Sequence, residues 1–366
     1  MPTLYLIEQN TVLRKTGDRL RLCSKPDPGR KGGPPRVGDI LLEVPCADID
    51  HVMLFGNIQV TTQALHEMLE HGIEFALFTQ SGVLLGQLTP PLAKNIPLRI
   101  AQFQKHGDPA FALGFAKAVV RNKINNAAAM LREHRKNHPA SLNAADIDAL
   151  KALVARAESA ASLDTLRGHE GAATAAYFKL FGKMLNPPWG FTTRTRRPPK
   201  DPVNAVLSFG YTIVGAELQA LLDGAGFDPY LGFYHSVEYG RPGLALDLLE
   251  EFRHPLVDRL TLNLFNLGAL TSPDFAPQLE GSKTLAGGIY LNADGKKKFF
   301  VQYERMLGEL AGATALSGPT AFADATALSG ATKTAKPRSF RAAFQDQIAK
   351  LSKAVLQGVD YAPFSV

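Results

Sequence analysis

The chain has 366 residues, a length that allows about two domains. Hydrophobic residues make up 45% of it and charged residues 20%, a composition that excludes a mostly disordered chain. The 40 lysines and arginines outnumber the 34 acidic residues and give a net charge of +6. This excess is compatible with a polyanionic partner, but equally with a mildly basic soluble protein.

Cysteine usage and the N-terminal residues predict a cytoplasmic protein. The two cysteines, Cys23 and Cys46, are too few for a disulfide scaffold or a cysteine-rich zinc module, so we expect two buried thiols in a reducing compartment. The first residues, MPTLYLIEQNTVLRK, do not show the basic and then apolar pattern of a signal peptide. No uninterrupted run approaches the roughly 18 apolar residues of a membrane span, and we expect no membrane association.

Residues 1–90 are predicted to form a small β-sandwich domain with one helix. Gln9-Asn10 and Gly17-Asp18 separate the first strands and are typical of hairpin turns. Residues 61–72 break the β pattern, because their apolar residues recur at helical spacing. The basic, Pro- and Gly-rich residues 24–38 are predicted to be an exposed loop. The predicted strands are the short alternating runs at 3–8, 11–15, 19–23, 39–44, 48–55, 73–78 and 83–88.

The rest of the chain is predicted to be helical, which makes the fold class α+β. Pro-rich residues 91–100 indicate a linker, and residues 101–310 are predicted to form a larger all-α domain. Residues 311–366 begin with a low-complexity segment, in which TALSG occurs twice, and end with a predicted amphipathic helix at 339–356. The other helices are expected at 109–135, 140–166, 168–184, 201–224, 243–253, 255–267 and 296–310.

Three windows of the helical domain carry side chains suited to chemistry. In the first, RGHEGAATAAYF (167–178), Glu170 lies among glycines and alanines, which let helices pack closely around one carboxylate. The alternative is an exposed glutamate near a helix start, where the helix dipole favours it.

The second window, GFYHSVEYGRPGLALDLLEEFR (232–253), combines a histidine with two carboxylates. Asp247 and Glu250 are three residues apart on a predicted helix and face the same way, while His235 precedes them in a Gly- and Pro-rich loop. An imidazole and carboxylates can hold a hard divalent ion with open water positions. The alternative is a solvated acidic helix face with a capping histidine.

The third window gathers cations in front of a helix that Asp201-Pro202 opens. Cations at a helix N-terminus suit a phosphate backbone, whereas the alternative is a solubilising basic loop. Neither an HExxH zinc signature nor a P-loop occurs in the sequence, which disfavours those two enzyme classes. The cations of this window are Arg194, Arg196, Arg197 and Lys200.

Together these segments resemble the CRISPR-associated integrase family, the universal metal-dependent DNA endonuclease of CRISPR adaptation, in the form found in type I systems. The resemblance covers about residues 3–310 and is carried by segments in the expected order. They are LFGNIQVTTQAL (54–65), GIEFALFTQSGVLLGQL (72–88), RGHEGAATAAYF (167–178), RRPPKDPVNAVLSFGY (196–211) and GFDPYLGFYHSVEYGRPGLALDLLEEFR (226–253). Residues after 310 lie outside the resemblance, and we assign them no chemistry.

The resemblance implies a set of functional residues. Glu170, His235 and Glu250 are expected to bind a divalent ion, Mg²⁺ or Mn²⁺, although many relatives have aspartate at the last position. Asp247 is expected close to the metal and important for activity, where it orients a metal-bound water or takes a proton. For DNA we expect Arg194, Arg196 and Lys200 along the backbone and Arg241 beside the scissile phosphate.

The resemblance also implies the reaction and the partners. A 3′-hydroxyl of a spacer precursor attacks a phosphodiester in the CRISPR repeat, so the expected partner is double-stranded DNA. The protein is expected to work as a homodimer, two of which bridge a dimer of a small ferredoxin-like adaptation protein. Two other classes stay open: a metal-dependent DNA or RNA nuclease without integrase activity, and a catalytically idle DNA-binding scaffold.

Overall fold

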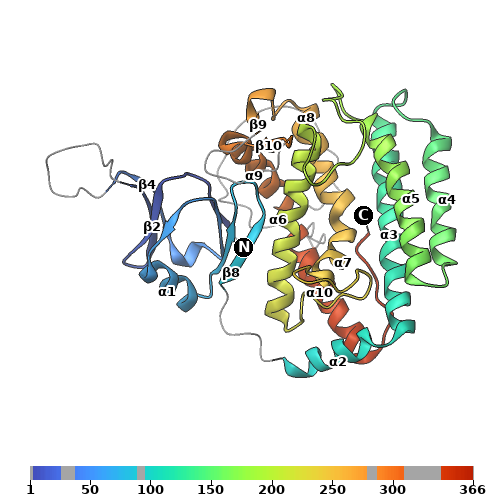
Figure 1. Ribbon diagram of the computed structural model, residues 1–366, viewed down its shortest axis with the longest axis horizontal. Helices are drawn as coiled ribbons and strands as arrows, with labels where there is room; N and C mark the ends of the chain where they lie inside the picture. Colours follow the sequence, from blue (N-terminus) through green and yellow to red (C-terminus); the bar gives the residue numbers. More distant parts are fainter. Residues whose placement is uncertain (1–2, 26–37, 89–94, 278–286, 309–338, 366) are drawn as a thin grey trace, which may run out of the picture.

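The structure, a computed structural model, describes residues 3–25, 38–88, 95–277, 287–308 and 339–365. A strand-rich part, residues 3–88, is followed by a larger helical part, and α6 lies in the middle of the molecule (Figure 1). This arrangement confirms the predicted α+β class. Residues 26–37 of the predicted loop at 24–38, and the low-complexity residues 311–337, fall outside the described residues.

The strand-rich part contains two four-stranded sheets that share one core. The inner sheet has the order β1-β5-β7-β8 and comprises β1 (Thr3–Leu6), β5 (His51–Phe55), β7 (Glu74–Phe78) and β8 (Leu84–Leu88). The outer sheet has the order β4-β3-β2-β6 and comprises β4 (Ile40–Pro45), β3 (Arg19–Ser24), β2 (Thr11–Thr16) and β6 (Gln59–Val60). A 3₁₀ turn, η1 (Cys46–Asp48), and helix α1 (Thr62–Glu70) complete this part.

One of the two predicted hairpins is wrong. Gly17-Asp18 does join β2 to β3 in an antiparallel hairpin, and Gly17 takes the positive φ of +56° that such a turn favours. At Gln9-Asn10, however, the chain crosses between the sheets, because β1 pairs in parallel with β5 and not with β2. The Gln9 side chain fixes this crossing by donating to the carbonyls of Ile7 and Phe55.

The inner sheet joins the strand-rich part to the helices, because its two faces carry different cores. Val52 and Leu54 face the outer sheet, whereas Met53 and Phe55 belong to the large core of the helical part, as strand alternation requires. Phe55 lies 5.8 Å, between ring centroids, from Phe209 of α6 (Pro202–Ala225).

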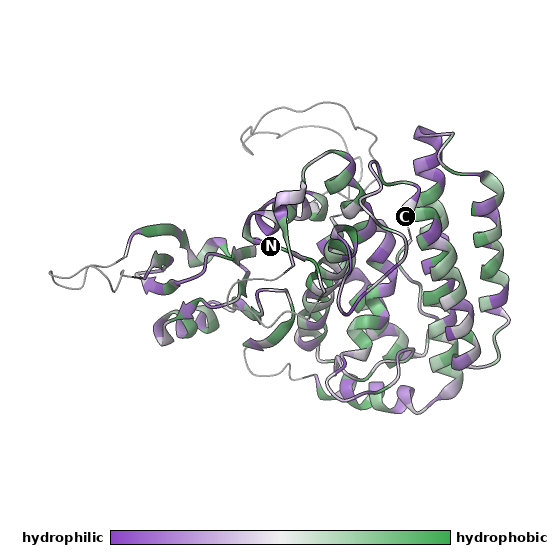
Figure 2. Ribbon diagram, turned by 45° about the horizontal axis from the view of Figure 1, so that its top comes forward, coloured by the Kyte–Doolittle hydropathy of each residue, from purple (hydrophilic) through white to green (hydrophobic). Residues whose placement is uncertain are grey.

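The helical part packs its helices around one large apolar core. Many of the helices carry both hydrophobic and hydrophilic residues along their length (Figure 2), as expected for amphipathic helices that bury one side. Besides α6 these helices are α2 (Ile96–His106), α3 (Pro109–Asn137), α4 (Ala144–Glu158), α5 (Leu163–Gly182), α7 (Gly243–Phe252), α8 (Arg259–Asn266), α9 (Ala293–Gly308) and α10 (Phe340–Gln357). Shorter elements are η2 (Arg253–Asp258), η3 (Ser272–Asp274), β9 (Phe275–Ala276) and β10 (Tyr290–Leu291).

Several helix boundaries differ from the predictions. Helix α2 begins inside the predicted linker, because Asn95 caps it and Pro97 suits its first turn. Helix α5 begins at Leu163, capped by Ser162, five residues before the predicted start at 168. Helices α7 and α8, predicted as separate, are continuous through the π-helical turn η2.

Helices α6 and α10 both pack into the core. Of the described helices, α6 alone has the length and hydropathy of a membrane span. It contains no uninterrupted apolar run of that length, and 72% of its most apolar window is buried. Helix α10, predicted from Ser339 onwards, begins at that cap and packs against α2, α6 and α9.

Candidate metal centre

Glu170 and Glu250, far apart in the chain, both contact Lys123 in the helical part, and His235 lies beside Glu250. Glu170 comes from the middle of α5, Glu250 from α7, and His235 from the loop between α6 and α7. The Nζ atom of Lys123, on α3, contacts Glu170 Oε1 and lies 2.6 Å from Glu250 Oε2. His235 Nε2 lies 3.9 Å from Glu250 Oε1. Because α5 begins earlier than predicted, Glu170 is an inward-facing residue of a helix and not an exposed residue at its start.

Asp247 holds His235 in position from the Nδ1 side of the imidazole, opposite the Nε2 atom that faces Glu250. Its Oδ2 accepts the backbone N–H groups of Phe233 and Tyr234 at 2.7 and 3.0 Å. Its Oδ1 accepts the backbone N–H of His235 at 2.9 Å and lies 2.7 Å from His235 Nδ1. Asp247 is fully buried, so it contacts the imidazole rather than the space between the three predicted ligands.

The loop that carries His235 can reach Asp247 because of a glycine. A Cβ atom on Gly232 would lie 2.7 Å from Asp247 Oδ2 and 2.7 Å from the backbone of Gly243. Any larger residue at 232 would therefore push the loop away from the start of α7. The close approach lets three consecutive backbone N–H groups converge on one carboxylate.

Both glutamates are held in the charged form. Burial raises the pKa of Glu250, but Arg253 and Lys123 outweigh it and hold that pKa well below its usual range. Burial likewise raises the pKa of Glu170, and Lys123 again lowers it below the ordinary value. The Arg253 side chain lies with Nε 2.9 Å from Glu250 Oε2 and stacks over Tyr211.

The residues fit a divalent cation. The Lys123 ammonium bridges both carboxylates, which shows that their oxygens converge where one positive charge satisfies both. The hydrogen bond to Asp247 leaves Nε2 as the ring nitrogen that faces Glu250. Two carboxylates and one imidazole with a carboxylate behind it form a donor set suited to Mg²⁺ or Mn²⁺.

The predicted DNA-binding residues have different environments. Arg194 is turned inward, where it donates to Asn204 Oδ1 at 2.8 Å and Ser208 Oγ at 2.9 Å, and burial lowers its pKa to about 10. It therefore attaches the loop before α6 to that helix and does not extend into solvent. Arg196 and Lys200 are exposed. Arg241 is half-buried, with Nη1 2.6 Å from Glu238 Oε1.

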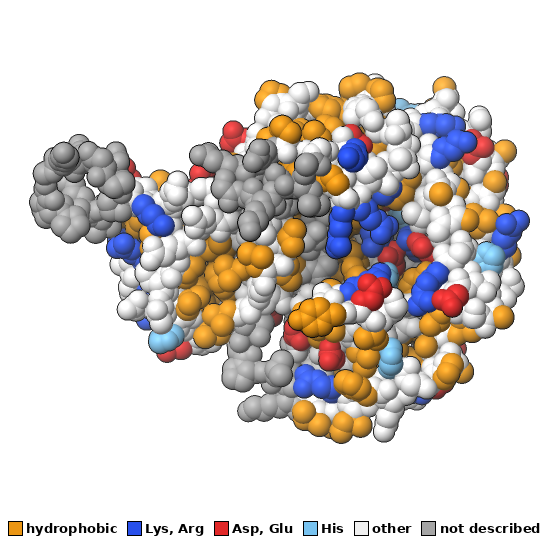
Figure 3. Space-filling model, in the orientation of Figure 1, with side chains coloured by type: hydrophobic (Ala, Val, Ile, Leu, Met, Phe, Trp, Pro, Cys, Tyr) orange, Lys and Arg blue, Asp and Glu red, His pale blue; other side chains and the backbone are white. Residues whose placement is uncertain are grey.

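Basic side chains gather on one face of the helical part. Figure 3 shows Lys and Arg side chains gathered around a hollow there, with acidic side chains among them.

Two residues of the centre, Lys123 and Arg253, were not predicted from the sequence. Lys123 lies one helical turn from buried Val119 and Ala127, so a lysine on an apolar helix stripe was the signal. Arg253 follows Glu250 at i+3 spacing.

Comparison with known proteins agrees with the resemblance found in the sequence. Residues 4–305 match the family model described as CRISPR associated protein Cas1. The chain is 35% identical over 272 residues to a CRISPR-associated endonuclease Cas1 of Thermus thermophilus, which covers 74% of this chain and 76% of that protein. A casposase bound to an integration product has a similar fold, with a TM-score of 0.78, 21% identity, and coverage of 99% of this chain and 93% of that one. A chain of a Cas6-RT-Cas1–Cas2 complex has a TM-score of 0.74 and 26% identity, covering 100% of this chain and 36% of that one. With its family confirmed by the matched model and by these relatives, the chain belongs to the CRISPR-associated Cas1 family.

Proposed function

We propose that this chain is a metal-dependent DNA endonuclease and integrase that inserts spacer DNA into a CRISPR array in the cytoplasm. The observation that carries the proposal is that Glu170 and Glu250 share the Lys123 ammonium and that His235 Nε2 lies beside Glu250, although the three residues come from separate segments of the helical part. The names of curated relatives as endonucleases, and of the casposase as bound to an integration product, support the same reaction class.

In the proposed reaction, the 3′-hydroxyl of a spacer precursor attacks a phosphodiester of the repeat, so one P–O bond forms and one breaks. A divalent ion, Mg²⁺ or Mn²⁺, held by Glu170, His235 and Glu250, would supply positive charge for the phosphate oxygens and favour the attacking oxygen. Arg253 keeps Glu250 ionised and fixed. Asp247 serves as a positioning residue, because it holds His235 with Nε2 facing Glu250.

The exposed cations next to the site are the proposed DNA contacts. Arg196, Arg197 and Lys200 are all exposed in the segment before α6 and can reach a phosphate backbone. Arg241 reaches DNA only if it leaves its ion pair with Glu238. Arg194, which the sequence analysis placed along the backbone, instead shapes the loop that presents its neighbours.

We further propose a homodimer that binds a small ferredoxin-like adaptation protein. Among the described strands, β4 lies at the end of the outer sheet and exposes Ile40, Leu41 and Leu42 by 53, 50 and 38%. An edge strand with exposed apolar residues favours pairing with a second chain. The strand-rich residues 1–90 would therefore dimerise and residues 101–310 would carry the reaction. The similar Cas6-RT-Cas1–Cas2 complex contains Cas2, which supports a second protein partner.

The test uses a DNA duplex with free 3′-hydroxyls, a supercoiled plasmid carrying the repeat, the small partner protein, and Mg²⁺ or Mn²⁺. Glu170→Gln, His235→Ala and Glu250→Gln should each abolish strand transfer while DNA affinity stays close to wild type. Glu250→Gln should also lower the unfolding temperature, because it removes the buried carboxylate that pairs with Lys123 and Arg253. Glu158→Gln, an exposed glutamate on α4, is the matched control and should retain full activity.

The products separate the proposal from its two alternatives. Joined DNA indicates an integrase, nicked plasmid alone indicates a nuclease, and DNA binding without turnover indicates an idle scaffold. Full strand transfer by any two of the three ligand variants would refute the proposed ligand set.

A further inference from the structure

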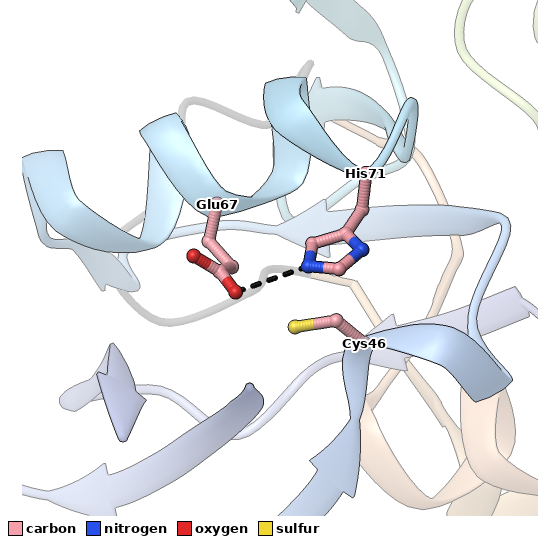
Figure 4. A group of neighbouring side chains, drawn as sticks. All are labelled: Cys46, Glu67 and His71. Carbon is pink, nitrogen blue, oxygen red and sulfur yellow. Dashed lines mark hydrogen bonds and ion pairs between the residues drawn. The ribbon is translucent and has the colours of Figure 1, made fainter. Parts of the chain in front are cut away.

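A second group of metal-ligand side chains lies in the strand-rich part, within the described residues. Cys46 is the first residue of η1, and Glu67 and His71 are four residues apart at the end of α1. The thiol sulfur, a carboxylate oxygen and an imidazole nitrogen all lie within 4.8 Å of one another. Figure 4 shows the three side chains pointing toward one another from the turn and the helix, with His71 Nε2 3.1 Å from Glu67 Oε1.

The burial of these groups leaves one side open. Cys46 and Glu67 are 1 and 3% exposed, whereas the His71 side chain is 40% exposed. A metal ion between them would therefore be shielded on the sulfur side and accessible to water on the histidine side. Three protein ligands with one side open would leave a place for water as the fourth ligand of a tetrahedral ion.

The donor chemistry differs from that of the centre in the helical part. A thiolate, an imidazole and one carboxylate suit Zn²⁺, whereas Mg²⁺ and Mn²⁺ prefer oxygen ligands. Two ligands at i and i+4 on one helix are also the spacing that lets a helix chelate zinc. The two sites can therefore be distinguished by metal, because the Cys46 group favours Zn²⁺ and the centre in the helical part favours Mg²⁺ or Mn²⁺.

Lys15 is compatible with such a site. Its ammonium pairs with Glu67 Oε2, whereas Oε1 is the oxygen that faces His71. The carboxylate can thus bind a metal through one oxygen while Lys15 holds the other, as residues behind a metal ligand commonly do.

We propose that Cys46, Glu67 and His71 bind one Zn²⁺ ion that links the turn η1 to the end of α1 and stabilises the strand-rich part. On binding, the Cys46 S–H bond breaks, a S–Zn bond forms, and the proton passes to solvent. The site neither uses nor requires the residues of the centre in the helical part.

The experiment titrates the metal-free full-length chain with Co²⁺, a spectroscopic substitute for Zn²⁺, and then displaces it with Zn²⁺. A near-ultraviolet thiolate-to-cobalt band should rise to one equivalent and disappear when Zn²⁺ is added. Cys46→Ser should abolish the band, and Cys23→Ser, the matched change at the other buried thiol, should keep it. His235→Ala should also keep it, which separates this site from the proposed catalytic one.

Affinity and stability give independent readouts. His71→Ala changes a partly exposed residue and should weaken Zn²⁺ binding by at least about tenfold without unfolding the chain, so it tests the site even if Cys46→Ser fails to fold. Zn²⁺ should raise the unfolding temperature of the wild type and not that of Cys46→Ser. A wild-type chain without a thiolate band, a band that survives Cys46→Ser, or unchanged Zn²⁺ affinity in His71→Ala would overturn the proposal.

Discussion

Replacing Asp247 by asparagine should disable His235 without changing the size of the side chain. The carboxylate accepts three backbone N–H groups and lies 2.7 Å from His235 Nδ1. An asparagine has a single acceptor oxygen, so its NH₂ group must face part of this donor set. If the amide oxygen stays on Phe233 and Tyr234, the NH₂ group faces His235. Nδ1 must then accept a hydrogen bond from that NH₂ group, so the ring proton lies on Nε2, which can no longer bind a cation.

The size of the effect follows from the hydrogen bonds that an asparagine cannot accept. Two hydrogen bonds to a charged group, at about 1.5–3 kcal/mol each, predict a loss of about 3–6 kcal/mol in the free energy of unfolding. Changing the group that orients a metal-bound histidine should lower the affinity for Mn²⁺ by about 10–100-fold. Strand transfer should fall with it, and high Mn²⁺ should restore part of the activity.

The assay combines calorimetric Mn²⁺ titration, denaturant unfolding and strand transfer. Asp274→Asn is the matched control, because Asp274 is also a buried carboxylate, accepting from Thr271 and Lys298 away from the metal centre. It should lose stability while its Mn²⁺ affinity stays at the wild-type value. If Asp247→Asn loses stability but binds Mn²⁺ as tightly as wild type, the positioning role of Asp247 is refuted.

Three further changes test other features of the molecule. Lys123→Met leaves the buried Glu250 and the half-buried Glu170 without their shared cation, so the metal-free chain should lose about 3–5 kcal/mol of stability. Added Mn²⁺ should then raise its unfolding temperature more than that of wild type, and equal increases would contradict this. Burial raises the pKa of Glu217 to about 7, above its unfolded value, so its neutral form stabilises the fold below about pH 4.5 and that contribution is lost as the pH rises through 7. The free energy of unfolding of wild type, measured in urea, should therefore fall by about 3 kcal/mol from pH 5 to 8 relative to that of Glu217→Gln. Parallel pH profiles of the two free energies would disprove this. Arg196→Ala with Arg197→Ala should reduce the salt dependence of DNA binding by about one counterion per arginine, with Mn²⁺ affinity as the unchanged control; an unaltered slope would exclude these contacts.

Capping residues in the sequence correctly predicted where some helices begin. Asp201 and Pro202 opened α6, and Ser339 opened α10, as their sequences indicated. Pairing between strands could not be predicted in this way. Gln9-Asn10 has the composition of a hairpin turn, yet β1 finds its partner in β5, far along the chain. Turn propensity describes the bend of the backbone and not which strand the chain meets afterwards.

In the site, too, the spacing of residues along one helix could be predicted, whereas their burial and long-range contacts could not. The i, i+3 spacing predicted that Asp247 and Glu250 face the same way, and both lie beside the His235 ring, one at Nδ1 and the other at Nε2. Their different roles depend on burial, which spacing does not reveal. Arg194 was placed at DNA for its charge, but Asn204 and Ser208, one helical turn apart on α6, bind it instead.

Lys123 shows why the remainder of the centre needed a structure. A lysine on the apolar stripe of α3 must find acidic partners, because an unpaired buried ammonium is costly. The sequence does not say that these partners come from α5 and α7, and only their packing against α3 brings Glu170 and Glu250 to one nitrogen. The same oxygens are the proposed metal ligands, so the ammonium and a divalent ion compete for them. Lys123 would therefore hold the two carboxylates together at low metal concentration, and the free energy needed to displace it would lower the apparent metal affinity.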